Sequence, residues 1–381
     1  MKIVVDARWI FPRLSGIGLY TRELIERLAA AGGGHTYVLL FQRPDVEARV
    51  RRSTRLDRAP NVRFERVADG IFSPTGQWRM PRRLRRWGAD VFHSTNYFIP
   101  YAAFPRSGGG RTRCVATLHD LIPLLFPQYT PRALKTRLMP LFRRLLRETV
   151  RRADAVIVPS ECSRRDVLRH LGMPAGCGDR VVVVPQGVDA RFRPAPEPAR
   201  EPWLLYVGRF DPYKNVPRLV EVFARVRERV PDARLRIVGE PDPRYPEARR
   251  TAERLGLGDE TIRWDGYLGD EGLVAAYQGA AAAVLLSSYE GFGLPVLEAM
   301  ACGVPVVCSD CASLPEVAGD AAMLVPPDDP DAAAGALVRV LTDRALAAGM
   351  REKGLRRAAA FTWEETARRT LEVYERAAGG T

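Results

Sequence analysis

A glycine-containing run at residues 287–298, Ser-Ser-Tyr-Glu-Gly-Phe-Gly-Leu-Pro-Val-Leu-Glu, carries the clearest chemical signal in the sequence. A buried strand is expected before the run and a helix from Leu294, with Pro295 in the first turn, where a missing N–H costs nothing. The free N–H groups and partial positive charge of that helix end suit a phosphate. Glu290 and Glu298 can accept hydrogen bonds from the hydroxyls of the same ligand. The alternative is a strand–turn–helix with two solvated glutamates.

A second run, residues 206–215, holds two cations five residues apart, Arg209 and Lys214. A strand is expected to end at Gly208 and a helix to follow. Two cations beside a helix N-terminus can bind a diphosphate. Two ordinary surface cations are the alternative. Both this run and the glutamate run follow predicted strands of the same domain, which favours a common site.

Two further motifs follow predicted strands in the first half of the chain. Ser15-Gly-Ile-Gly18 lies between the first strand and the first helix, where Gly16 and Gly18 let the backbone approach a ligand closely. It lacks the third glycine of the dinucleotide motif, so a tight turn is an equal alternative. His119 and Asp120 follow another strand, and His93 ends a third. Each histidine is either a polar group of the site or a hydrogen-bonded structural histidine.

Metal-binding patterns are weak. Cys308 and Cys311 form a lone C-x-x-C without a second pair, so buried thiols are the better interpretation. Asp329 and Asp331 lie in a proline-rich loop and are expected to cap a helix. We therefore expect neither a metal nor a resident cofactor.

Short apolar strands alternate with amphipathic helices along the chain, which favours parallel sheets covered by helices on both faces. The expected strands are Lys2–Asp6, Tyr37–Phe41, Val62–Arg66, Asp90–His93, Arg113–Leu118, Ala155–Val158, Val181–Val184, Trp203–Val207, Leu235–Val238, Thr261–Trp264, Ala282–Leu286, Val304–Cys308 and Met323–Val325. The expected helices are Ile17–Ala31, Gln77–Trp87, Pro131–Arg152 with a kink at Pro140, Ser160–Leu171, Asn215–Val230, Asp270–Gln278, Leu294–Ala301 and two or three pieces of Asp329–Ala378.

The proline-rich run 193–202 divides this pattern into two parts. We predict an α/β protein with a Rossmann-like doubly wound domain over residues 1–192, a linker over 193–202 and a second such domain over 203–362. The two domains are expected to face each other across a cleft. In such sheets ligands bind beyond the carboxyl ends of the strands.

Charge is distributed unevenly between the two parts. The chain of 381 residues has a net charge of +13, with +18 in residues 1–198 and −5 in residues 199–381. Much of the excess lies in two basic amphipathic stretches, 78–87 and 131–152. Solvated cover helices are one interpretation, an anionic lipid surface a second, and nucleic acid the least favoured, since no nucleic-acid-binding module accompanies them.

The length and composition are those of a globular protein of two or three domains. The N-terminal apolar run is too short for a signal peptide, and no stretch approaches the length of a membrane-spanning helix. We expect a cytoplasmic protein, with peripheral binding to the inner face of the membrane left open.

These motifs together resemble those of retaining nucleotide-sugar glycosyltransferases of the GT-B fold, family 4. The resemblance covers nearly the whole chain and is carried by Glu290–Glu298 and its extension to Val307, by Val207–Arg209 with Lys214, by residues 15–18 and by residues 184–189. Residues 119–123 and 266–271 look most like the mannosyltransferase branch. The family often has Asn where Gln186 stands, so Gln186 and Asp189 are treated as adjacent to the site.

The resemblance implies roles for individual residues. Arg209 and Lys214 would bind the donor diphosphate beside Gly208, and Gly16 and Gly18 would close over it. Glu298 would accept from the ribose, and Glu290 from the sugar. The remaining donor residues are the loop and its amides, Gly291, Phe292, Gly293 and Leu294, and the base site, Gly239, Tyr267 and Leu268.

The acceptor side is expected in the first domain. His119 would touch the donor sugar near its anomeric centre, and His93 and Asp120 would be adjacent. The leaving phosphate itself would take the proton of the acceptor, and no metal would be needed. The final helix, 363–381, would return to the first domain.

The sequence thus predicts transfer of a hexose, best mannose from GDP-mannose, to a saccharide or a polyprenyl-linked saccharide. The alternatives are the same reaction with a UDP-sugar, or a membrane- or nucleic-acid-binding protein with a vestigial sugar site. The base, the acceptor and the oligomeric state stay open.

Overall fold

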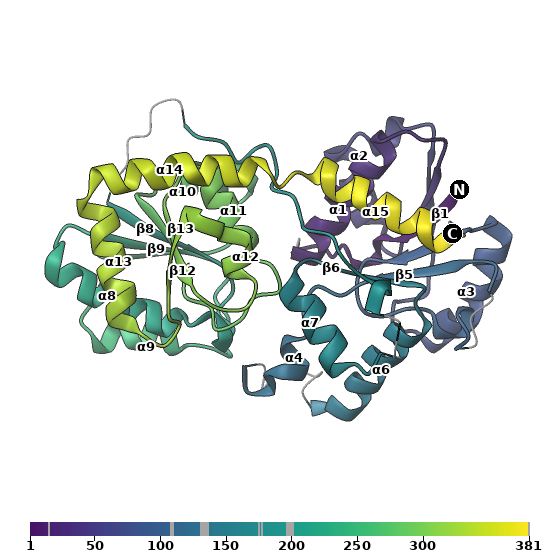
Figure 1. Cartoon of the computed structure of the whole chain (residues 1–381), viewed down its shortest axis with the longest axis horizontal. Coiled ribbons are helices and arrows are strands. Elements are labelled where there is room, and N and C mark those ends of the chain that lie inside the picture. The colour runs from purple at the N-terminus through teal and green to yellow at the C-terminus, as the bar shows by residue number, and fades with distance from the viewer. Residues whose placement is uncertain are drawn as a thin grey trace. The chain divides into compact units, whose positions relative to one another are not determined.

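The computed structural model describes residues 1–13, 16–106, 110–129, 137–173, 176, 178–195 and 202–379 (Figure 1). The chain divides into two compact units. Unit 1 contains Met1–Leu124, Leu138–Gly187 and Trp363–Thr381, and unit 2 contains Leu125–Arg137 and Val188–Thr362. Two boundaries therefore differ from the expected ones: residues 188–192 and the segment Leu125–Arg137 belong to unit 2. Within the predicted linker, residues 196–201 lie outside the described part.

Unit 1 is built on a parallel sheet of seven strands in the order β3-β2-β1-β4-β5-β6-β7. The strands are β1 (Lys2–Asp6), β2 (Thr36–Phe41), β3 (Val62–Arg66), β4 (Val91–Ser94), β5 (Arg113–Thr117), β6 (Ala155–Val158) and β7 (Val181–Val183). The central strands β1, β4 and β5 are mostly apolar and are buried except at the first residues of β1 and β5, as a sheet covered on both faces requires. The strand order reverses between β1 and β4, so a crevice is expected beyond their carboxyl ends.

Helices cover both faces of this sheet. They are α1 (Gly16–Ala30), α2 (Pro44–Ser53), α3 (Pro74–Trp87), α4 (Ile122–Leu125), α6 (Met139–Arg152), α7 (Glu161–His170) and α15 (Trp363–Ala378). Local signals fix their ends: the Ser73 hydroxyl caps the start of α3, and Gly88 ends it with a left-handed φ of 65°.

Helix α15 belongs to the core of unit 1, although it follows unit 2 in the chain (Figure 1, yellow). Its residues Trp363, Ala367, Val373 and Tyr374 join one apolar cluster with the strands β1, β2 and β5 and with helix α1. Trp363 and Tyr374 are at most 1% exposed. Unit 1 is therefore complete only when α15 is in place.

Unit 2 repeats the architecture with six parallel strands in the order β10-β9-β8-β11-β12-β13. The strands are β8 (Trp203–Val207), β9 (Arg234–Val238), β10 (Ile262–Asp265), β11 (Ala282–Leu285), β12 (Val306–Ser309) and β13 (Ala322–Val325). The helices are α8 (Val216–Arg229), α9 (Glu247–Arg254), α10 (Asp270–Gln278), α11 (Leu294–Ala301), α12 (Leu314–Ala318), α13 (Pro330–Thr342) and α14 (Arg344–Ala359). Here the strand order reverses between β8 and β11.

The expected elements agree closely with those observed, with two differences. Helices α2 and α9 and the short helices α4 and α12 are additional. The segment predicted as helix 131–152 is described as a helix only from Met139, and residues 130–136 lie outside the described part. Pro140 lies in the first turn of α6, where a proline is tolerated, and the kink predicted there would involve residues outside the described part.

Across the described segments, no helix combines the length and apolar character needed to span a bilayer. Among the described cysteines, which are Cys114, Cys162, Cys302, Cys308 and Cys311, none forms a disulfide. Asp329 caps α13 by accepting hydrogen bonds from the amides of Asp331 and Ala332, as expected.

Candidate active site

The reversal of strand order between β8 and β11 places two loops of unit 2 at the carboxyl edge of its sheet. The loop after β8 carries Arg209 and Lys214, and the loop after β11 carries Glu290. Because ligands of open α/β sheets bind at such a reversal, these are the residues best placed to meet one.

Lys214 and Glu290 form a direct ion pair across this point. The Lys214 ammonium donates to Glu290 Oε1 at 2.6 Å, and the Ser287 hydroxyl donates to the same oxygen at 2.6 Å. Both charged residues are less than 10% exposed. Since an ammonium has three N–H donors and a carboxylate has two oxygens, each partner keeps capacity for a ligand.

Hydrogen bonds from neighbouring elements fix the Glu290 loop. Asn215 adopts a left-handed conformation (φ 54°) and donates its side-chain amide to Leu286 O and to Ser288 Oγ, both at 2.8 Å. The Ser313 hydroxyl donates to Glu290 O at 2.9 Å and to Phe292 O at 2.7 Å. The Asn215 and Ser313 side chains thus hold the loop mainly through its backbone carbonyls, and Glu290 Oε2 keeps capacity for a ligand.

The start of α11 faces the same loop. Gly293 has φ 113°, and a Cβ atom there would lie 2.8 Å from Leu314 Cδ2, so only glycine fits. In the described part of the chain, no side chain caps this end of α11, and Pro295 occupies its first turn. The helix dipole and the first amides are therefore suited to an anion, as the sequence predicts.

Arg209 contrasts with the buried Lys214. Its side chain is 71% exposed and its Nε lies 2.8 Å from Asp211 Oδ2. The buried Tyr206 hydroxyl donates to Arg209 O at 2.6 Å and fixes the turn. At the next strand end, a Cβ on Gly239 would lie 2.0 Å from Gly208 O, so this close approach of two loops requires glycine.

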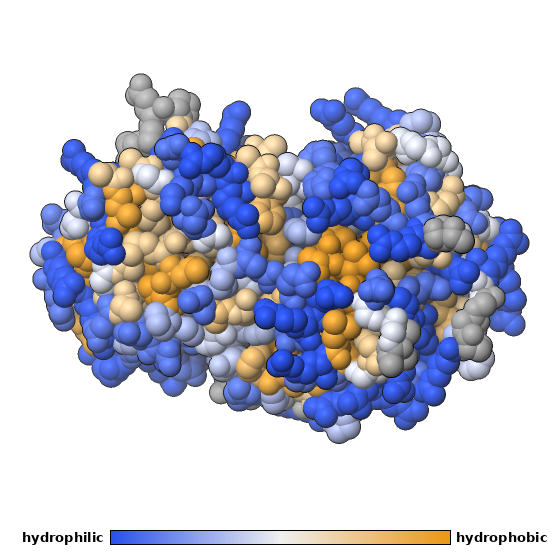
Figure 2. Space-filling view, in the orientation of Figure 1, coloured by the Kyte–Doolittle hydropathy of each residue, from blue (hydrophilic) through white to orange (hydrophobic). Residues whose placement is uncertain are grey.

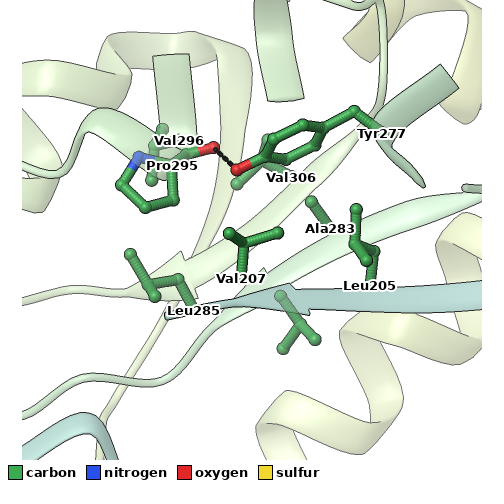
Figure 3. Close-up of a pocket in the computed structure, with 9 residues that line it drawn as sticks. Leu205, Val207, Tyr277, Ala283, Leu285, Pro295, Val296 and Val306 are labelled. Carbon is green, nitrogen blue, oxygen red and sulfur yellow. Dashed lines mark hydrogen bonds between the residues drawn. The ribbon is translucent and has the colours of Figure 1, made fainter. Parts of the chain in front are cut away.

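Glu298 is buried in the second turn of α11, where the Tyr277 hydroxyl donates to its Oε2 at 2.8 Å. Burial raises the pKa of Glu298 to about 7, and the Asp189 charge adds to this, while Tyr277 and Arg191 act in the opposite direction. Figure 3 shows the Tyr277 ring above apolar side chains of β8, β11 and β12, with its hydroxyl turned toward Pro295 O. Tyr277 therefore connects α10 to the start of α11.

The other predicted donor residues of unit 2 occupy the same sheet edge. Tyr267 and Leu268 follow β10, and Tyr267 is 63% exposed. Gly291 and Phe292 lie in the loop before α11. Asp189 also belongs to unit 2 and pairs with Arg191 at 2.6 Å, while Gln186 belongs to unit 1.

In unit 1, His119 has both ring nitrogens engaged. Its Nε2 lies 3.0 Å from Thr95 O, and its Nδ1 lies 3.2 Å from Gln186 Nε2. Burial lowers the pKa of His119. Asp120 is exposed and accepts a hydrogen bond from the Ile122 amide at 3.0 Å, which begins the short helix α4.

His93 is a core residue and does not reach the surface. It is fully buried between Tyr374 Oη (2.6 Å) and Thr117 Oγ1 (2.8 Å), and burial lowers its pKa to about 3. Of the two interpretations that the sequence left open, the structure shows the hydrogen-bonded structural histidine. Gly16 and Gly18 lie at the start of α1, and Ser15 is outside the described residues.

The structure thus brings Lys214, Glu290 and the start of α11 together. It adds three residues that sequence reasoning missed, Asn215, Ser313 and Tyr277. Of these, Asn215 had a local signal, since it directly follows Lys214 at a helix start. The other two act through contacts distant in sequence. Within the described ranges, no group of three or more His, Cys, Asp or Glu residues could hold a metal ion.

Comparison with known proteins identifies both halves of the chain. Residues 188–357 match the family model for glycosyl transferases group 1, and residues 14–192 match that for glycosyltransferase family 4. The chain is 30% identical to an O-antigen chain mannosyltransferase B of Escherichia coli, over 98% of this chain and all of that protein.

Solved structures also resemble this chain over nearly its whole length. A sucrose-phosphate synthase from Thermosynechococcus elongatus superposes with a TM-score of 0.78 at 26% identity, over 98% of each chain. The Anabaena protein Alr3699/HepE in complex with UDP superposes with a TM-score of 0.75 at 18% identity, over 99% of this chain and all of that one. With two parallel-sheet α/β domains of the GT-B type and a match to a mannosyltransferase over its whole length, this chain belongs to glycosyltransferase family 4.

Proposed function

We propose that this glycosyltransferase moves mannose from GDP-mannose to a saccharide or lipid-linked saccharide, with retention of configuration and without a metal. The buried Lys214–Glu290 pair at the strand reversal of unit 2, beside the uncapped start of α11, is the observation that carries this proposal. The likeness to an O-antigen chain mannosyltransferase supports mannose as the sugar.

The chemistry is electrostatic. As the glycosidic bond to the donor breaks, negative charge grows on the leaving diphosphate, and fixed donors aimed at it lower the barrier. Lys214, Arg209 and the amides at the start of α11 supply that field. Glu290, held on one oxygen by Lys214 and Ser287, offers its other oxygen to sugar hydroxyls. The leaving phosphate would accept the proton of the attacking hydroxyl.

For the acceptor, we propose the strand reversal of unit 1, between β1 and β4. Aromatic rings gather near this edge: Trp9 and Phe11 follow β1, Tyr97 follows β4 and Phe72 follows β3. Trp9 contacts Phe11, Phe72 and Tyr97 at centroid distances of 6.3, 5.8 and 5.6 Å. Phe11 and Phe72 are 43% and 57% exposed. Exposed aromatic faces of this kind suit the C–H faces of sugar rings.

Incubation with GDP-mannose and a mannose-containing oligosaccharide tests the proposal. We expect release of GDP and a product whose new linkage has the α configuration of the donor, as seen in the anomeric coupling by NMR. Activity should survive EDTA. An inverted linkage would refute retention, loss of activity in EDTA that Mg²⁺ restores would refute metal independence, and no release of GDP would refute the donor.

A UDP-sugar is the second candidate donor, favoured by the structural likeness to a protein solved with UDP. Thermal-shift measurements with GDP-mannose, UDP-glucose and UDP-N-acetylglucosamine distinguish the two. A ligand at about 100 times its Kd stabilises the fold by about 2.7 kcal/mol, so the true donor should shift Tm by several degrees.

We further propose that unit 1 binds anionic membranes through the outer faces of α3 and α6. Both helices pack against the short helical turn Tyr101–Ala103. Their exposed faces carry the apolar side chains Trp78 (71% exposed) and Leu141 (51%) among arginines, and Leu138 (49%) lies just before α6. In Figure 2 hydrophilic side chains dominate the visible surface over these helices. Arginine heads near apolar tips match a lipid interface.

Liposome pelleting tests this surface. We expect binding to vesicles with anionic lipid at low salt, weakening as salt rises, since each near-surface cation contributes about 1 kcal/mol. The double variant Trp78→Ser/Leu141→Ser should lose binding. The matched variant Leu255→Ser, which alters an exposed leucine of unit 2, should not. Equal binding to neutral vesicles would contradict the proposed attraction between these arginines and anionic lipid.

A further inference from the structure

The hydrogen bonds of His119 define which of its nitrogens carries the proton. Thr95 O, 3.0 Å from Nε2, is a carbonyl oxygen and can only accept. Nε2 must therefore carry a hydrogen. A neutral imidazole has one N–H, so Nδ1 is left as an acceptor.

Gln186 supplies the matching donor. Its side-chain nitrogen lies 3.2 Å from Nδ1, and an amide nitrogen can only donate. Gln186 is 6% exposed, and the turn that carries it is tied to α15, because the Thr366 hydroxyl donates to Pro185 O at 2.8 Å. The amide is therefore presented to the ring by a fixed backbone.

Burial favours the neutral ring because it lowers the pKa of His119, whereas the hydrogen bond to Thr95 O and the Asp120 charge act in the opposite direction. The Tyr20 ring stands edge-on to His119 at 4.8 Å, and the Ser163 hydroxyl donates to His119 O at 3.3 Å. Asp120 is the nearest acidic group, and its Oδ1 accepts from the Ile122 amide. His93, a core residue hydrogen-bonded to Thr117, is uncharged near neutral pH, since burial lowers its pKa to about 3.

We propose that Gln186 is a positioning residue that holds His119 in its neutral tautomer, with the proton on Nε2 and directed at Thr95 O. His119 then contributes a fixed ring edge to unit 1 and exchanges no proton with a substrate. This goes beyond the role first expected for His119, because both nitrogens already have protein partners.

The length of the Gln186 side chain matters for this role. Asparagine is one methylene shorter, by roughly 1.5 Å. From the same backbone it would not reach Nδ1 at hydrogen-bonding distance. Glutamate has the right length but offers only acceptors, so it would draw a proton onto Nδ1 and charge the ring.

Nitrogen-15 NMR of histidine-labelled full-length protein tests the tautomer directly. The chain has four histidines, so the His119 signals can be assigned by their loss in His119→Asn. In the wild type we expect an N–H type shift for Nε2 and an acceptor type shift for Nδ1, unchanged between about pH 6 and pH 8. A protonated Nδ1, or titration in this range, would overturn the proposal.

Variants of Gln186 test its part in this arrangement. Gln186→Asn and Gln186→Leu should mix the two tautomers, and Gln186→Glu should raise the pKa of His119 by about 1–3 units. The matched variant Gln278→Glu, at an exposed hydrogen bond of unit 2, should leave the His119 signals unchanged. If Gln186→Asn and Gln186→Glu both leave the His119 shifts and titration as in the wild type, Gln186 has no such role.

A kinetic measurement connects this to catalysis and rests on the proposed function. In Gln186→Glu, kcat should fall several-fold more at pH 6 than at pH 8, where His119 is less charged. An equal loss at both pH values would show that the charge of His119 does not affect transfer. The NMR result needs no donor, so it stands even where mannose transfer from GDP-mannose is not detected.

Discussion

The hydrogen bond from Tyr277 to Glu298 gives a quantitative prediction about pH and donor binding. Glu298 is buried, and its pKa is raised from 4.5 to about 7. At pH 7 about half of the molecules therefore carry the carboxylate, which is the better acceptor for the ribose hydroxyls that Glu298 is predicted to bind. The ionised fraction of Glu298 decreases below pH 7 and approaches one above about pH 8, so nucleotide affinity should rise with pH through this range.

Replacing Tyr277 by Phe removes the donor to Glu298 Oε2 at 2.8 Å and keeps the ring. A hydrogen bond to a charged group contributes about 1.5–3 kcal/mol, which corresponds to about 1–2 units of pKa. The carboxylate fraction at pH 7 should then fall from about one half to roughly 1–10%. We expect affinity for GDP to fall about 5- to 50-fold at pH 7 and to recover toward pH 9.

Calorimetric titration with GDP at several pH values measures this. Glu298→Gln should bind weakly at every pH, because its amide does not titrate. Tyr37→Phe is the matched control, since the buried Tyr37 hydroxyl of unit 1 has no hydrogen-bond partner among the described residues. If Tyr277→Phe binds GDP as the wild type does, with the same dependence on pH, then Tyr277 does not tune Glu298.

The same shift affects folding. The native state binds the Glu298 proton more tightly than the unfolded chain does, so between about pH 4.5 and pH 7 it holds the extra proton. The raised pKa of this carboxyl group therefore contributes stability that is fully present below about pH 4.5 and is lost as pH rises through about 7. Glu298→Gln should remove this decline, which denaturant unfolding at pH 5 and pH 8 would reveal.

Three further variants test the site and the fold. Lys214→Met should lower kcat about 10²- to 10³-fold and destabilise the protein by leaving Glu290 buried and unpaired; adding Glu290→Gln should restore Tm but not turnover. Gly293→Ala should cost about 1–3 kcal/mol in unfolding free energy because of its positive φ, whereas Gly335→Ala, in open space on α13, should gain about 0.5–1 kcal/mol. Trp363→Ala should cost about 3–5 kcal/mol, measured by urea unfolding, and a loss below 1 kcal/mol would show that α15 is not part of the core.

Strand positions could be predicted from the sequence because each strand is a short apolar run between polar turns. Helices α2 and α9 were not predicted because their buried faces carry few large apolar side chains. In α2 the apolar contact comes from Val46 and Val50 among charged residues, and α9 buries only small side chains, including Ala248 and Ala252. Neither pattern gives a wide apolar stripe.

The site could be predicted in part. The carboxyl ends of parallel strands meet at one edge, so Lys214 and Glu290 could be assigned to a common place. Their direct ion pair and the contact between Gln186 and His119 could not, since they join residues 76 and 67 positions apart through side-chain geometry alone. His93 illustrates the converse, because a strand-end position did not determine whether its ring faces a loop or the core.

The position of α15 has a consequence for synthesis on the ribosome. Unit 1 contains the earliest residues, yet it lacks Trp363 and Tyr374 until unit 2 has been translated. Domains generally fold as units in the order of their synthesis. Here unit 2 can complete its core first, while the larger part of unit 1 waits with the groove for α15 exposed. A nascent chain would present apolar surface for the time needed to translate unit 2, and this interval is when a chaperone would bind it.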